Sequence, residues 1–139
     1  GNLFVAGDTG FGDGEWPREA ARYGPIRLAL LPIGAFRFGK GQMESGSHIG
    51  PIQSVEVFRR LRAANAIGIH WGTFQLSYEA RETPPRMLAE VMKCHGFDPA
   101  AFHTIGIGAT AVVPPYVAPP TGHDPAPACL SGPAITKLP

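Results

Sequence analysis

The chain has 139 residues, the length of one domain, and its 44% hydrophobic and 17% charged residues are typical of a globular protein. A formal net charge of +1 gives no reason to expect a nucleic-acid partner. No apolar run approaches the roughly 18 residues of a membrane span, so no transmembrane segment is expected.

Apolar runs alternate with helical patterns along the first 113 residues. The order predicts an α/β fold in which helices connect parallel strands. Prolines placed for a first turn and glycines placed for a stop mark the helix ends. In chain order, the predicted elements are a strand at 3–7, a helix at 16–23, a strand at 26–33, a helix opening at Pro51, a strand at 67–70, a helix at 83–95, and strands at 104–108 and 110–113 that form a hairpin or one bent strand.

Three helices of this kind do not cover both faces of so apolar a sheet. If all of them lie on one face, the other face exposes more apolar surface than the ~300–600 Å² patch of a usual soluble monomer. The sequence therefore predicts that a missing half or a partner chain covers the second face.

The composition changes after Val113. Residues 114–139 contain eight prolines and only two charged side chains. Because proline interrupts helices and central strands, this stretch is predicted to be an extended tail, either disordered or lying along a partner surface. The expected organisation is a domain at 1–113 followed by the tail at 114–139.

Cys94 and Cys129 are the two cysteines of the chain. Their separation matches neither a disulfide framework nor zinc-finger spacing. Both are predicted to be free thiols in a reducing compartment, and a cytoplasmic location is expected.

Polar side chains that can bind metal end two of the predicted strands. Asp8 follows the first strand and His70 ends the third, and strand ends are where α/β proteins place their chemistry. Each has a structural alternative: Asp8 can cap a turn, and His70 can be a half-buried histidine bonded to a backbone carbonyl. His48 lies in the Gly/Ser-rich loop at 34–50, where substrate binding, metal ligation and no role at all are open alternatives.

Together these segments resemble the C-terminal half of metallo-β-lactamase-fold hydrolases, in the branch of N-acyl-phosphatidylethanolamine-hydrolysing phospholipase D. The resemblance covers residues 2–113 in order and rests on Ala-Gly-Asp-Thr-Gly at 6–10, Pro-Ile-Gly-Ala at 32–35, His48, Ile-His-Trp-Gly-Thr-Phe at 69–74 and Pro-Pro at 84–85. It implies half of an αββα sandwich, with helices on one face of the sheet and a one- or two-metal zinc site between two such layers.

The resemblance also implies roles for three residues. Asp8 corresponds to the carboxylate that bridges two zinc ions, His70 to the last histidine ligand, and His48 to a histidine near the substrate phosphate. The family's His-x-His-x-Asp-His motif does not occur in this chain, which is a departure from the pattern.

The sequence thus predicts a zinc-dependent hydrolase of phosphodiesters or related esters that works through a zinc-activated water. Catalytic zinc needs about three protein ligands, and Asp8, His70 and His48 provide that number. A homodimer closing over the bare sheet faces is expected to assemble the site. The alternative is a non-catalytic truncated fragment or an association module that keeps the fold without a complete metal site.

Overall fold

The computed structural model describes residues 1–40, 42 and 45–139. In this part of the chain, four parallel strands form one sheet in the order β1-β2-β3-β4. The strands are β1 Asn2–Val5, β2 Ile26–Pro32, β3 Asn65–Ile69 and β4 Phe102–His103. The helices are α1 Trp16–Ala21, α2 Pro51–Leu61, α3 Thr83–Cys94, α4 Pro127–Leu130 and α5 Pro133–Thr136.

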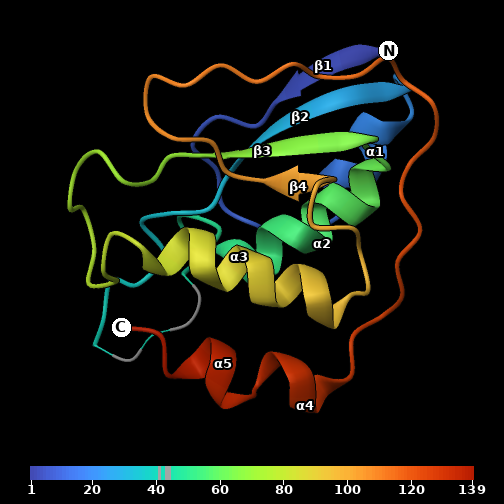
Figure 1. Ribbon diagram of the computed structural model, residues 1–139. Coiled ribbons are helices and arrows are strands. Elements are labelled where there is room, and N and C mark those ends of the chain that lie inside the picture. The colour runs from blue at the N-terminus through green and yellow to red at the C-terminus, as the bar shows by residue number, and fades with distance from the viewer. Residues whose placement is uncertain (41, 43–44) are drawn as a thin grey trace.

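The three helices that connect the strands, α1, α2 and α3, all lie on one face of the sheet (Figure 1). Each new strand is added on the same side of the previous one. Crossovers of the same hand that advance in one direction place every helix on the same face. The predicted half-sandwich with helices on one face is therefore confirmed.

The hydrophobic core lies between this helix layer and the sheet. Phe4, Ala29, Ala66 and Phe102 occupy one row across the four strands and point toward the helices. Phe58 of α2 packs against Phe102, with 5.4 Å between ring centroids. The core is thus built from one face of each strand.

The opposite face of the sheet is apolar and carries no helix. Val5, Leu30 and Ile67 form a row on this face because they alternate with the core residues and are neighbours in the register. Leu3 and Val5 of β1 are 61% and 56% exposed. Ile67 is only 9% exposed, so the accessible part of this surface lies at β1 and β2, and we call the surface around Leu3, Val5 and Leu30 the open face.

The strands predicted after the third crossover are wrong. Residues 104–113, all of which are described, form no strand, and only Phe102 and His103 pair with β3. The backbone turns instead at Gly106–Ala109, where Ala109 N–H donates to Gly106 O and Gly108 has a φ of +79°. The residues on either side of this turn form no strand, so neither the predicted hairpin nor the bent strand is present.

The tail is extended only in its first half, which corrects the prediction for residues 127–139. Its final residues return to the helix layer, where α4 and α5 lie beneath α3 (Figure 1). Pro127 and Pro133 open these two single-turn helices, and the first turn is where proline's missing N–H costs nothing. Ile135 of α5 is 1% exposed and belongs to the core. The division into domains at residue 113 stays a prediction.

The prediction of free thiols is wrong as well, because Cys94 and Cys129 form a disulfide. The tail folds back under α3 and brings the two Cα atoms to 5.8 Å, which a separation of 35 residues does not reveal. The cytoplasmic location loses the argument on which it rested and stays an untested prediction. Among the described residues, no helix has the length and apolar character needed to cross a bilayer.

Candidate metal centre

Asp8 stands just beyond the carboxyl end of β1. Ala6 N–H still donates to Leu30 O of β2, at 3.1 Å, and Gly7 then takes a φ of +66°, a conformation that glycine adopts readily. The turn at Gly7 leaves the Asp8 side chain at the sheet edge, 58% exposed. This edge is where all parallel strands end, so it gathers the side chains that follow them.

His70 follows β3 at the same edge. Its backbone has a φ of +61°, which is uncommon for a residue other than glycine. His70 Nδ1 lies 3.3 Å from Gly34 O in the turn after β2. In the tautomer that carries its hydrogen on Nδ1, this nitrogen donates to the carbonyl and leaves the Nε2 lone pair free for a metal, the usual arrangement for a ligating histidine.

His48 reaches the edge from the loop between β2 and α2. Its Nε2 lies 2.8 Å from Asp8 Oδ1, and its ring lies 5.4 Å from the ring of His70. Ser45 fixes the backbone here: its Oγ accepts from His48 N–H at 3.0 Å and donates to His48 O at 2.9 Å. The loop therefore holds the His48 ring against both other residues.

The structure thus brings all three predicted side chains together. One nitrogen of each histidine and one oxygen of Asp8 lie within 4.8 Å of one another, and no other metal-binding group of this kind occurs in the described part of the chain. His48 Nδ1 is buried and has no hydrogen-bond partner among the described residues. Two imidazoles and a carboxylate suit zinc, and three protein ligands with an open position are typical of a catalytic site. The residues present fit such an ion.

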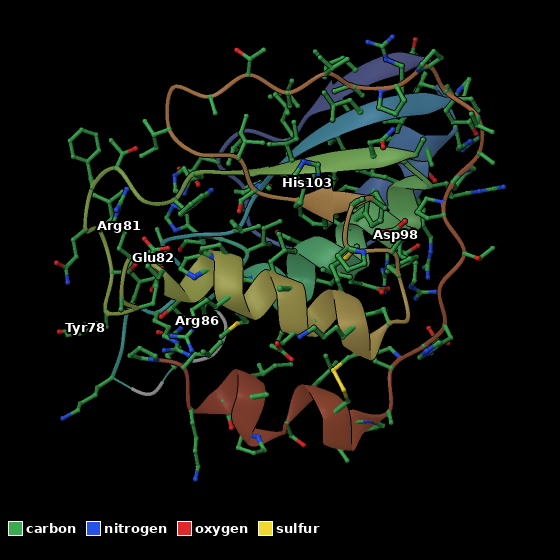
Figure 2. The ribbon with its side chains drawn as sticks, in the orientation of Figure 1. Tyr78, Arg81, Glu82, Arg86, Asp98 and His103 are labelled. Atoms are coloured by element: carbon green, nitrogen blue, oxygen red, sulfur yellow. A yellow bond between two sulfur atoms is a disulfide. The ribbon has the colours of Figure 1, made fainter. Side chains whose placement is uncertain are left out.

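A cleft of about 760 Å³ opens beside His70. The loop between β3 and α3 forms most of its wall, and Tyr78 and Arg81 project from this loop in Figure 2. Trp71, Phe74 and Leu76 make the wall largely apolar. The cleft places an organic group next to the three polar side chains.

Ser45 and Glu79 are parts of this site that sequence reasoning missed. Glu79 lines the cleft, is 6% exposed and accepts from two backbone N–H groups more than forty residues away. No motif in the sequence marks either residue. The one available signal for Glu79 is its position in the loop that follows His70.

Comparisons with known proteins identify the family of this chain. Residues 1–71, just over half of the chain, match the family described as the beta-lactamase superfamily domain. Over 108 residues the chain is 38% identical to N-acyl-phosphatidylethanolamine-hydrolyzing phospholipase D 1 of Caenorhabditis elegans, with 76% of this chain and 30% of that protein covered. Over 96 residues it is 36% identical to the mitochondrial N-acyl-phosphatidylethanolamine-hydrolyzing phospholipase D of Saccharomyces cerevisiae, with 68% and 20% covered.

The chain therefore spans less than a third of the length of these relatives. The matched part contains Asp8, His48 and His70. The resemblance inferred from the sequence is confirmed, and the chain belongs to the beta-lactamase superfamily.

Proposed function

We propose that this chain carries one layer of a zinc-dependent hydrolase that acts on phosphodiesters or related esters. The observation that supports it best is the cluster of Asp8, His48 and His70, whose donor atoms lie within 4.8 Å of one another at the strand-end edge. The names of the two relatives specify hydrolysis by a phospholipase D, which cleaves a phosphodiester bond. The cleft beside His70 gives the organic part of such a substrate a place next to the cluster.

Each residue of the cluster has a task in this proposal. Asp8 and His70 hold the metal, His70 through Nε2 because Nδ1 is directed at Gly34 O. A zinc ion held by these residues would lower the pKa of a bound water toward about 7 and would thereby supply a nucleophile at neutral pH. His48 is either the third ligand or a proton donor. In the second role, the proton that its Nε2 shares with Asp8 moves to a developing anion on the phosphate or ester oxygen.

A second αβ layer stacked on the open face completes the site in this proposal. Catalytic zinc sites of the family lie between two layers, and the open face with Leu3 and Val5 exposed provides the contact surface. For the chain acting by itself, we propose that the second layer is another copy, in a homodimer.

Zinc content and hydrolysis of a nitrophenyl phosphodiester, before and after chelation, test the proposal. Wild-type protein is expected to bind zinc and to lose its activity with the metal. Asp8→Ala removes a ligand and should weaken zinc binding at least about tenfold, with a matching loss of activity. Asp98→Ala is the matched control, because this exposed aspartate lies at the opposite end of α3 from the cleft loop (Figure 2).

The alternative, a non-catalytic association module, predicts a different result. The described residues offer a single cluster of three donors and lack the family's first metal motif. Equal zinc content and equal hydrolysis in wild type and Asp8→Ala would reject the enzyme in favour of this module.

A further inference from the structure

Glu79 is a buried carboxylate that joins two loops far apart in the sequence. Its Oε1 accepts from Phe36 N–H at 3.2 Å and its Oε2 from Arg37 N–H at 3.0 Å. The residue is 6% exposed. Hydrogen bonds to a charged acceptor are stronger than neutral ones, and burial keeps water from competing for them. The two amides are therefore held firmly against the loop after β3.

A third contact joins the same two loops. Tyr78 N–H donates to Arg37 O at 2.8 Å, next to the two bonds that Glu79 accepts. Together these contacts fix residues 36–37 relative to residues 78–79. The Glu79 carboxylate accepts two of these three hydrogen bonds. Its side chain therefore largely determines how residues 36–37 are placed against residues 78–79.

The turn that Glu79 holds is the one that orients His70. Gly34 and Ala35 immediately precede Phe36, and Ala35 has a φ of +59°, so the chain bends sharply there. Gly34 O is the acceptor for His70 Nδ1, at 3.3 Å. A bond of this length is weak, and a small displacement of the carbonyl would break it. Ile33 N–H donates to Ile69 O at 3.0 Å and anchors the residue before Gly34, so the position of Gly34 O depends further on what anchors the residues after it.

We infer that Glu79 is a positioning residue for His70. By anchoring the turn at 34–37, it keeps Gly34 O within hydrogen-bond distance of His70 Nδ1, which leaves His70 Nε2 available to the metal. This inference rests on the proposed metal function of His70. Glu79 is not one of the three clustered donors, and in this inference it acts only through the backbone turn. A merely structural Glu79 would stabilise the fold without affecting the tautomer of His70.

Two measurements separate these roles. The first is the pair of ring ¹⁵N chemical shifts of His70 in metal-free protein above neutral pH, which reports the tautomer. The second is the affinity for Co²⁺, followed by its visible absorption. Because partners of this kind typically change metal affinity about 10–100-fold, Glu79→Ala should weaken Co²⁺ binding about tenfold and abolish the Nδ1–H preference of His70.

Glu79→Gln and Glu82→Ala complete the design. The glutamine keeps the size but accepts only one of the two bonds, so its effect on both measurements should be intermediate, and it decides the question if the alanine variant does not fold. Glu82 is an exposed glutamate three residues along, and Glu82→Ala should leave both measurements unchanged.

The inference is overturned if Glu79→Ala folds and keeps both the wild-type tautomer of His70 and the wild-type Co²⁺ affinity. If Glu79→Ala does not fold, the inference is overturned when Glu79→Gln leaves both measurements unchanged. Wild-type protein that shows the Nδ1–H tautomer but binds no Co²⁺ would instead contradict the proposed function. The two failures are distinguishable because the tautomer is measured without metal.

Discussion

Gly34, two residues beyond the end of β2, lies directly against the backbone that follows β3. A Cβ built at this position would collide with His70 O and would lie 2.9 Å from Trp71 Cβ. Neither neighbour is the far end of a flexible side chain, so the backbone itself would have to move. The glycine is required here by this close approach.

Gly34→Ala should therefore damage both stability and the metal centre. We expect a loss of about 1–3 kcal/mol in the free energy of unfolding, as for overpacked interiors, together with weaker metal binding because His70 is displaced. Denaturant unfolding and Co²⁺ titration measure the two effects. Gly106→Ala is the control, since its nearest neighbour would be 3.9 Å away. Equal stability and equal Co²⁺ affinity in wild type and Gly34→Ala would contradict this account.

At the same scale, the sequence identified the three side chains that meet but not the residues that hold them. Asp8 and His70 were predictable because each follows an apolar strand in a motif that resembles a known family. Glu79 was not, because its partners Phe36 and Arg37 are backbone amides more than forty residues away. Backbone acceptors and donors leave no pattern in a sequence.

Among the elements, the C-terminal segment behaves as a strap across the helix layer. His123 N–H donates to His95 O at 2.9 Å, and the disulfide joins α4 to the end of α3. Burial of His95 lowers its pKa, so the buried ring favours the neutral form. At the far end, Arg37 Nη1 donates to Leu138 O at 2.8 Å, and Thr83 Oγ1 donates to Pro139 O. The strap thus also contacts Arg37 and Thr83, which are close in sequence to the cleft-lining residues Ala35 and Pro84.

Breaking the disulfide should destabilise this strap. Cys129→Ser is expected to lower the free energy of unfolding by about 2–4 kcal/mol, because a loop of this length is no longer closed in the unfolded chain. Urea unfolding with and without dithiothreitol measures the effect. Wild type should lose stability in the reductant while Cys129→Ser should not respond. A wild type indifferent to full reduction would show that the disulfide contributes nothing to the strap.

For the whole molecule, the open face decides how the chain associates. Leu3 and Val5 are exposed while the neighbouring strands bury their side chains more deeply, so the β1 edge is the most accessible part of this surface. An isologous dimer would use the same patch on both copies. A single charge placed there would consequently occur twice in the interface.

Val5→Glu should therefore weaken self-association at least about tenfold, since a charge buried without a partner is costly. Sedimentation equilibrium over a range of protein concentrations measures the dimer dissociation constant. Tyr78→Glu is the control, because Tyr78 is 69% exposed and projects from the loop between β3 and α3, far from β1 (Figures 1 and 2). A wild-type chain that remains monomeric at all concentrations would contradict the homodimer.

The sequence by itself determined the α/β class, the three crossover units and the two polar side chains that follow strands, Asp8 and His70. These features depend on periodicity and on residues close together in the chain, which a sequence displays directly. Only the tertiary structure decided the Cys94–Cys129 pairing, the return of the tail and the anchoring of the His70 turn by Glu79. Those features depend on which distant segments meet, and that is settled by the packing of the whole chain.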